Sequence, residues 1–197
     1  MHSFSTVQAH LISVEPRLPA EWRALHAEFS HTLHRLQQYL HLPRTVIHGD
    51  VWAANTVQTP TGQVALIDWN SGGWGPAIFD LGRLLLECHL DSNLPVDDPS
   101  VWLIQPDEQR IAAVVDGYAK QRRLISTELD ALFDGLRFGI VFIGALHFTQ
   151  ALQDEIHPLE WERGMKRRLA RLQNRWDVSS EIASLARRHF ELLQEQR

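Results

Sequence analysis

The chain has 197 residues, 44% of them hydrophobic and 22% charged, with a formal net charge of −5 at pH 7. This composition predicts a globular domain, and the acidic balance argues against general binding to nucleic acid or to an anionic membrane. The single cysteine, Cys88, excludes a disulfide framework and a cysteine-based zinc site. Because the first residues lack the basic and apolar segments of a secretory signal, we expect a cytoplasmic protein.

The first third of the chain predicts one helix followed by short β-prone segments. Apolar residues recur at steps of three and four over residues 19–42, which predicts an amphipathic helix. The 18 residues before it, 1–18, are expected to form an N-terminal extension. Residues 45–48 are β-prone, and the segments 56–58 and 63–67 flank a turn that contains proline and glycine. Those two segments predict a β-hairpin.

The rest of the sequence predicts helices joined by loops. We expect helices near residues 77–90, 107–123, 127–153, 158–176 and 179–195. The uncharged apolar segment 138–148 is too short to span a bilayer and predicts a buried helix. Gly135, Gly139 and Gly144 in this region predict close packing between helices. The predicted fold class is α+β, mostly helical with a small β-hairpin.

Three polar side chains follow the predicted strands. Asp50 and Asn55 lie on the loop after the first strand, and Asp68 ends the second strand of the hairpin. If the hairpin folds back beside the loop, two carboxylates and an amide oxygen converge. Hard oxygen ligands of this kind suit Mg²⁺. The hairpin is therefore expected to carry a metal site.

Three motifs contain or adjoin these residues: H-G-D-x-x-x-x-N from His48, I-D-W around Asp68, and G-W-G-x-x-x-x-D-L, which includes Asp80. Their order and spacing resemble the catalytic core of the aminoglycoside phosphotransferase and choline kinase families, which share the protein-kinase-like fold. The resemblance covers residues 19–197 and implies the C-terminal lobe of such a kinase. It also implies an enzyme that transfers the γ-phosphoryl group of ATP to a hydroxyl of a small molecule.

The resemblance assigns the roles of the central residues. Asp50 matches the catalytic aspartate that accepts or orients the substrate hydroxyl proton. Asn55 and Asp68 match the residues that hold Mg²⁺. Many relatives carry an acidic residue where this chain has Asn70, so the number of bound ions stays open.

Two further motif residues are expected to organise the loop rather than to touch substrate. His48 has this role by resemblance, with a simple buried histidine as the alternative. Asp80 is expected to bond the loop backbone, although a carboxylate also favours a helix N-terminus by itself. Trp69 and Trp74 are predicted to be packing residues.

Kinases of this type also use an upstream β-rich lobe, with a loop over the phosphates and a lysine paired to a glutamate. Residues 1–47 hold no glycine and no lysine, so we expect this N-lobe to be absent. The chain would then be a fragment, a kinase completed by a second polypeptide, or a protein that keeps the fold for binding. We favour a kinase-family protein that is weak or inactive alone. The alternative is a non-catalytic pseudokinase-like interaction module, which could also self-associate.

The C-terminal helices are expected to build the substrate pocket. Asp154, Glu155, Glu160 and Trp161 could hold a cationic ligand by charge and cation–π contacts, with a solvated helix end as the alternative. His147 is predicted to be a satisfied core histidine.

A basic stretch follows that acidic segment. It consists of Arg163, Lys166, Arg167, Arg168, Arg171 and Arg175. It predicts the solvent-facing side of an amphipathic helix whose other side is apolar. Anion or nucleic-acid binding is the alternative explanation.

Overall fold

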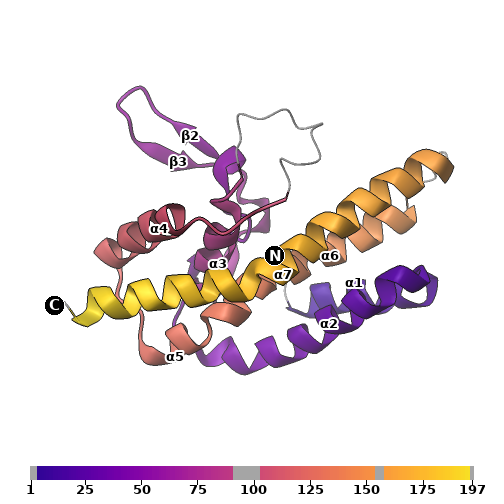
Figure 1. Cartoon of the computed structure of the whole chain (residues 1–197), viewed down its shortest axis with the longest axis horizontal. Coiled ribbons are helices and arrows are strands. Elements are labelled where there is room, and N and C mark those ends of the chain that lie inside the picture. The colour runs from indigo at the N-terminus through magenta and orange to yellow at the C-terminus, as the bar shows by residue number, and fades with distance from the viewer. Residues whose placement is uncertain (1–3, 91–102, 154–157, 196–197) are drawn as a thin grey trace.

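The computed structural model describes residues 4–90, 103–153 and 158–195 (Figure 1). Its helices are α1 Phe4–Val14, α2 Ala20–Leu36, α3 Ala77–Glu87, α4 Glu108–Gln121, α5 Ser126–Asp130, α6 Leu132–Gln153 and α7 Pro158–Glu195. Its strands are β1 Arg44–Ile47, β2 Thr56–Gln58, β3 Val64–Leu66 and β4 Gly73–Pro76. The mostly helical α+β fold class predicted from the sequence is confirmed.

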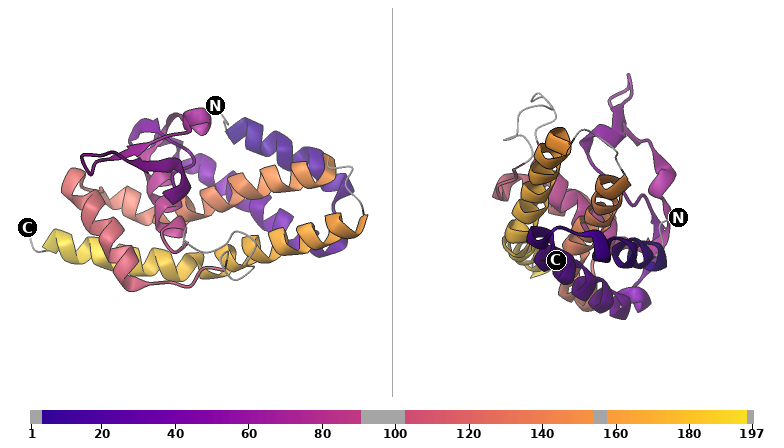
Figure 2. Two further views of the ribbon diagram at one scale, coloured as in Figure 1. Left: turned by 90° about the horizontal axis from the view of Figure 1, so that it is seen from above. Right: turned by 90° about the vertical axis from the view of Figure 1, so that its right-hand side faces the viewer.

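The strands form two separate antiparallel pairs. β2 pairs with β3 in the predicted hairpin, with Thr56 opposite Leu66. β1 pairs with β4, with Ile47 opposite Gly73. The sequence did not predict β4, because its glycine- and proline-rich composition has low β propensity and only the pairing with β1 defines it. Figure 1 and the right-hand view of Figure 2 show the hairpin projecting away from the helices.

Helix α6 is the centre of the hydrophobic core, and it packs against α1, α2, α3 and α7. Its segment Leu132–Thr149 is long and apolar enough to cross a membrane, with a mean hydropathy of 1.4. Within the protein, however, 67% of that segment is buried. Fully buried side chains such as Ile140 and Phe148 bear out the predicted buried helix. The apolar character of α6 is therefore accounted for by its neighbours.

The N-terminal helix belongs to the same core. Val7, Leu11 and Val14 on α1 are each almost completely buried in it. Polar contacts add to this packing, since His26 of α2 bonds the Leu11 carbonyl at 2.9 Å. Residues 4–14 thus pack as part of the helical body.

Helix α7 corrects one expectation, because the helices predicted at 158–176 and 179–195 form one continuous helix. The predicted break lay at residues 177–178, just before Ser179, a residue type that favours helix starts. Ser179 instead donates its hydroxyl to the Trp176 carbonyl at 2.7 Å, inside the helix. Buried Trp176 and Ile182 on either side continue the same apolar face, so packing holds the helix together.

Glycines allow α3 and α6 to cross at close range. A Cβ atom on Gly82 would lie 2.3 Å from the carbonyl carbon of Gly135, and one on Gly135 would lie 2.8 Å from the Ile78 carbonyl oxygen. Further along α6, a Cβ atom on Gly144 would lie 2.1 Å from Cε2 of the Phe29 ring. The close packing predicted from Gly135 and Gly144 is confirmed.

We predict that Gly82→Ala destabilises the protein. The added methyl group overlaps backbone rather than a movable side chain, and overpacking of a core costs about 1–3 kcal/mol. The free energy of unfolding in urea measures this cost. Gly117→Ala is the matched control, because a Cβ there meets nothing within 4 Å. The control should be neutral or more stable by up to about 1 kcal/mol, and equal effects of the two changes would contradict the close crossing.

Candidate active site

The loop after β1 is held by one carboxylate on α3. Asp80, in the first turn of that helix, accepts the backbone N–H of His48 at 2.6 Å and that of Gly49 at 2.8 Å. Burial raises the pKa of Asp80, and the two N–H donors partly offset this effect. Gly49 has φ of +78°, and a Cβ there would lie 2.5 Å from the Ser71 carbonyl oxygen. The sharp turn therefore requires glycine.

The buried ring of His48 connects the loop to the hairpin. Its Nε2 lies 2.8 Å from the Ile67 carbonyl oxygen, and its Nδ1 lies 3.3 Å from the backbone nitrogen of Asp50. A carbonyl only accepts and an N–H only donates, so both bonds fit a neutral ring with its proton on Nε2. Ile67 also donates its N–H to the Asn55 carbonyl at 2.9 Å. The hairpin is thus joined to both ends of the loop.

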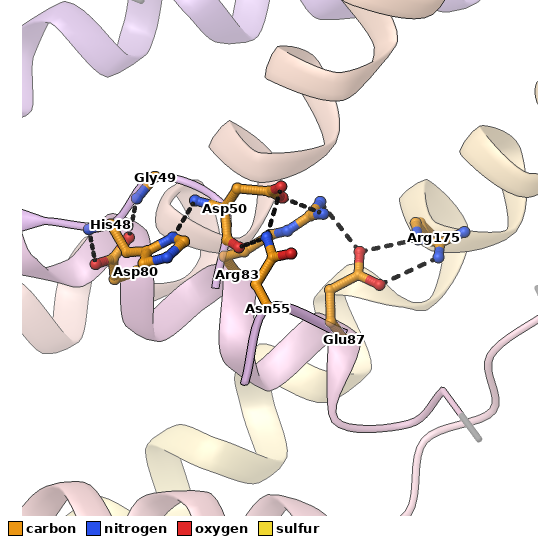
Figure 3. Close-up of polar contacts among 8 residues, drawn as sticks. All are labelled: His48, Gly49, Asp50, Asn55, Asp80, Arg83, Glu87 and Arg175. Atoms are coloured by element: carbon orange, nitrogen blue, oxygen red, sulfur yellow. Dashed lines mark hydrogen bonds and ion pairs between the residues drawn. The ribbon is translucent and has the colours of Figure 1, made fainter. Parts of the chain in front are cut away.

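Asp50 lies between two donors (Figure 3). Arg83 Nη2 is 3.0 Å from its Oδ1, and Asn55 Nδ2 is 3.0 Å from its Oδ2. Asn55 Nδ2 also donates to the Asp50 backbone carbonyl at 2.8 Å. Because both of these neighbours are acceptors, the amide group of Asn55 has its nitrogen toward Asp50 and its oxygen away from it.

Asp68 lies one residue beyond the backbone link between Ile67 and Asn55. Its backbone is left-handed, with φ of +61°, a conformation that aspartate tolerates better than most residues. The side chain is exposed, and its Oδ1 accepts a hydrogen bond from Asn70 Nδ2 at 2.6 Å. In the described part of the chain, no hydrogen bond joins the Asp68 carboxylate to Asp50 or Asn55. The structure therefore brings Asp50 and Asn55 into contact and leaves Asp68 beside them.

The donor set can be compared with the metal predicted from the sequence. The described residues contain no group of three or more His, Cys, Asp or Glu side chains that could hold an ion. Asn55 and Asp68 would supply an amide oxygen and a carboxylate. Mg²⁺ often takes only one or two protein ligands and completes its shell with water and substrate phosphates. The residues present thus fit Mg²⁺ bound together with a nucleotide, but not a site made by protein alone.

A buried chain of charges extends from Asp50 into the helical body (Figure 3). Arg83 Nη1 lies 3.1 Å from Glu87 Oε1, and Arg175 of α7 contacts both carboxylate oxygens of Glu87 at 3.3 Å. Arg83, Glu87 and Arg175 are each less than 10% exposed. Burial lowers the pKa of Arg83, while Glu87 and Asp50 oppose that effect.

Sequence reasoning gave no role to Arg83 or Glu87 and placed Arg175 on the solvent-facing side of its helix. A signal was present, because Asp80, Arg83 and Glu87 follow one face of a helix at steps of three and four. Their partner Arg175 lies 88 residues after Glu87, so no local pattern could have identified it.

A cavity of about 330 Å³ opens beside Asp50. Polar side chains and the apolar residues of α6 and α7 share its wall. It is lined by Asp50, Trp52, Ser71, Arg83, Glu87, Ile140, Phe142, Ile143, Leu146, His147, Arg171, Leu172 and Arg175.

The residues predicted to bind substrate cannot be placed in this cavity. Asp154 and Glu155 lie outside the described residues. Glu160 and Trp161 belong to α7, but their side chains lie outside what the structure describes.

Several expectations for the other polar and aromatic residues are corrected. His147 is not a satisfied core histidine, because it lines the cavity and its buried Nδ1 has no hydrogen-bond partner among the described residues. Arg171 lines the cavity and Arg175 is buried, so neither is simply on the solvent-facing side of its helix. Trp69 and Trp74 are 49% and 54% exposed, although Trp69 packs on the His48 ring.

A sequence model of the phosphotransferase enzyme family matches residues 6–122, which is more than half of the chain. The chain belongs to this family. The resemblance predicted from its motifs is thereby confirmed. No curated protein sequence matches this phosphotransferase-family chain.

A solved structure has a similar fold. The choline kinase LicA from Streptococcus pneumoniae matches with a TM-score of 0.54 and 15% sequence identity. The match covers 87% of this chain and 55% of the choline kinase, so the chain spans about half the length of that protein. At this identity the likeness concerns the fold alone.

We predict that Asp80→Asn loosens the loop after β1 and destabilises the protein. An amide offers one oxygen where the carboxylate offers two, so one backbone N–H loses its acceptor. An unsatisfied buried donor costs about 1–3 kcal/mol, which urea unfolding can measure. Glu181→Gln, an exposed carboxylate on α7, is the control and should change stability by less than about 0.5 kcal/mol. An unchanged stability in Asp80→Asn would contradict the role of this carboxylate.

We also predict a loss of stability in weak acid that depends on His147. Burial, together with Arg168, Arg175, Arg171 and Arg83, lowers the pKa of His147 from 6.5 to about 4. Between these pH values the unfolded chain binds a proton there and the folded chain does not. The free energy of unfolding therefore falls as the pH decreases from about 6.5 to about 4, by on the order of 3 kcal/mol from this group.

Urea unfolding at several pH values across this window measures that effect. His147→Gln should show a smaller loss of stability with acid than the unchanged protein. His31→Gln, at an exposed histidine, should keep the full loss. If both variants respond to pH as the unchanged protein does, His147 is not held neutral.

Proposed function

We propose that this protein is a small-molecule kinase that transfers the γ-phosphoryl group of ATP to a hydroxyl of its acceptor. The observation that carries the proposal is the position of Asp50. Its carboxylate is fixed by Arg83 and Asn55 and lines a cavity large enough for a small molecule. Membership of the phosphotransferase family supports the same reaction class.

Asp50 is the proposed catalytic residue. Each of its carboxylate oxygens accepts one hydrogen bond from the protein, and a carboxylate oxygen has a second lone pair available. An acceptor hydroxyl in the cavity would donate to that lone pair and give up its proton there during transfer. Arg83 and Asn55 act as positioning residues, because they fix the carboxylate from two sides before substrate arrives.

Asn55 and Asp68 are the proposed Mg²⁺ ligands. The orientation of the Asn55 amide supports this role, since its oxygen faces away from Asp50. Asn70 bonds one oxygen of Asp68 and leaves the other oxygen for a metal. When bound, Mg²⁺ would neutralise the negative charge that develops on the transferred phosphoryl group. His48 and Asp80 keep the loop and the hairpin together and touch neither substrate.

We further propose that this region needs another component for full activity. Apolar side chains on the strands and beside Asp68 are between 37% and 69% exposed. They are Val46, Val57, Val64, Leu66, Ile67, Trp69 and Trp74. Exposed apolar surface of this kind marks a contact site. A nucleotide-covering lobe, in a longer chain or a second polypeptide, would fit it, and the described chain alone would then be a weak kinase. The same surface favours a second candidate, a non-catalytic interaction module that binds a partner or a second copy.

Isothermal titration calorimetry of MgATP into the purified protein tests the proposal. We expect binding that requires Mg²⁺ and is lost in Asp68→Ala. Asp50→Asn should still bind MgATP, because Asp50 is not a metal ligand, but should reduce phosphoryl transfer by about 10²–10⁴-fold, the usual contribution of a positioned base.

The outcomes separate the two candidates. Absence of Mg²⁺-dependent nucleotide binding at millimolar concentration would contradict the kinase proposal for this chain and favour the interaction module. Equal transfer by Asp50→Asn and the unchanged protein would show that Asp50 is not the base.

A further inference from the structure

We propose that Asn70 is a positioning residue for the metal ion and makes the metal site selective for Mg²⁺ over Ca²⁺. Its amide holds one oxygen of Asp68 in a hydrogen bond, so that Asp68 offers a single, oriented oxygen to the ion. The inference rests on the proposed function in one respect, the assignment of Asp68 as a metal ligand. The contact between the two side chains does not depend on that assignment.

The contact joins two side chains on the surface of the protein. Asn70 Nδ2 lies 2.6 Å from Asp68 Oδ1, and both residues are exposed. Because a carboxylate oxygen only accepts, the nitrogen of the amide faces Asp68 and its oxygen faces away. Among the described residues, neither side chain has another hydrogen bond or ion pair. An exposed carboxylate without such a bond exchanges among its rotamers, so this bond decides how Asp68 is oriented.

The backbone around Asp68 keeps position 70 within its reach. Asp68 is left-handed, with φ of +61° and ψ of +59°, and the next three residues form one 3-10 turn. The Gly72 N–H closes this turn by donating to the Trp69 carbonyl at 2.9 Å. The Trp69 indole N–H donates to the Leu66 carbonyl at 3.1 Å and connects the turn to β3. The bond from Asn70 is therefore part of a defined turn.

The hydrogen bond limits what Asp68 can offer to a cation. Oδ1 accepts from the amide, and the positive end of that N–H dipole disfavours a cation at the same oxygen. Oδ2 has no partner among the described residues and is the oxygen left for an ion. Mg²⁺ is small and keeps several of its waters, whereas Ca²⁺ takes more oxygen ligands and often both oxygens of one carboxylate. A carboxylate restricted to one oxygen therefore favours Mg²⁺.

The identity of residue 70 decides this restriction. An ionised aspartate at this position could not donate to Asp68, and it would add a further oxygen beside it. The amide of Asn70 has the opposite effect, because it occupies one oxygen of Asp68 with an N–H. Asp68 then serves one ion through one oxygen.

Mn²⁺ without nucleotide tests the role of Asn70. It prefers the same oxygen ligands as Mg²⁺, and it broadens nearby nuclear magnetic resonance signals even when it is weakly bound. The signal to follow is the indole N–H of Trp69, the residue next to Asp68, assigned as the one missing in Trp69→Phe. We expect Asn70→Ala to need about tenfold more Mn²⁺ for equal broadening, the lower end of the usual loss when a partner of a metal ligand is removed.

Two further variants locate the ion. Asp68→Ala should remove the broadening. Gln58→Ala removes an exposed amide from the same hairpin and should leave the broadening unchanged. Circular dichroism melting checks that each variant is folded. Absence of broadening in the unchanged protein at millimolar Mn²⁺, or broadening that persists in Asp68→Ala, would overturn the inference. Equal broadening in Asn70→Ala and the unchanged protein would overturn it as well.

Competition of Mg²⁺ and Ca²⁺ against Mn²⁺ separates positioning from the simple loss of a ligand. Asn70→Ala and Asn70→Asp both release Oδ1 of Asp68, so both should shift the preference of the site toward Ca²⁺. If Asn70 bound the ion directly, Asn70→Ala would weaken the binding of both ions alike. An unchanged preference in either variant would overturn the proposed selectivity.

These measurements and the kinase proposal fail separately, because the measurements use no ATP and follow no phosphoryl transfer. An effect of Asn70→Ala on Mn²⁺ without any binding of MgATP would support the role of Asn70 and contradict the proposed kinase function. Binding of MgATP that is lost in Asp68→Ala, with no effect of Asn70→Ala on Mn²⁺, would do the reverse.

Discussion

The constraint on which this structure depends is the burial of a guanidinium next to the candidate catalytic aspartate. Arg83 is almost completely enclosed, and a buried charge persists only when paired. It is paired on one side with Asp50 and on the other with Glu87, which in turn is paired with Arg175. The position of Asp50 is therefore linked to helices far from it in sequence. Loss of one partner would leave a buried charge rather than merely remove a contact.

Helix α3 transmits this constraint. It carries Asp80, which holds the loop, as well as Arg83 and Glu87. Its own place is set by the close crossing of Gly82 on Gly135 of the central helix. A shift of this crossing would move the acceptor of the loop N–H groups and the partner of Asp50 together. Core packing and site geometry are thus two aspects of one helix.

Much of this arrangement was predictable, because its signals are local. The turn between β2 and β3 predicted the hairpin, and the glycines of α6 predicted the close helix crossing. The order of the three motifs predicted the family, which the family model confirms. What could not be predicted depends on distant partners. Arg175 lies in a basic stretch that predicts a solvent-facing position, yet it is buried and forms an ion pair with Glu87. Ser179 resembles a helix start, yet burial of Trp176 and Ile182 carries the helix through it.

The contacts of the proposed site residues could not be predicted from the sequence. The motifs pointed to Asp50, Asn55 and Asp68, and the structure joins the first two directly while Asp68 bonds Asn70. The attachment of the loop by Asp80 has one more consequence. Two backbone N–H groups bonded to Asp80, together with the His48 ring, hold the loop by contacts within the protein itself. A ligand that binds here does not have to order a flexible segment. Its binding free energy is therefore not reduced by the entropic cost of ordering the loop, which is about 1–2 kcal/mol for each backbone residue.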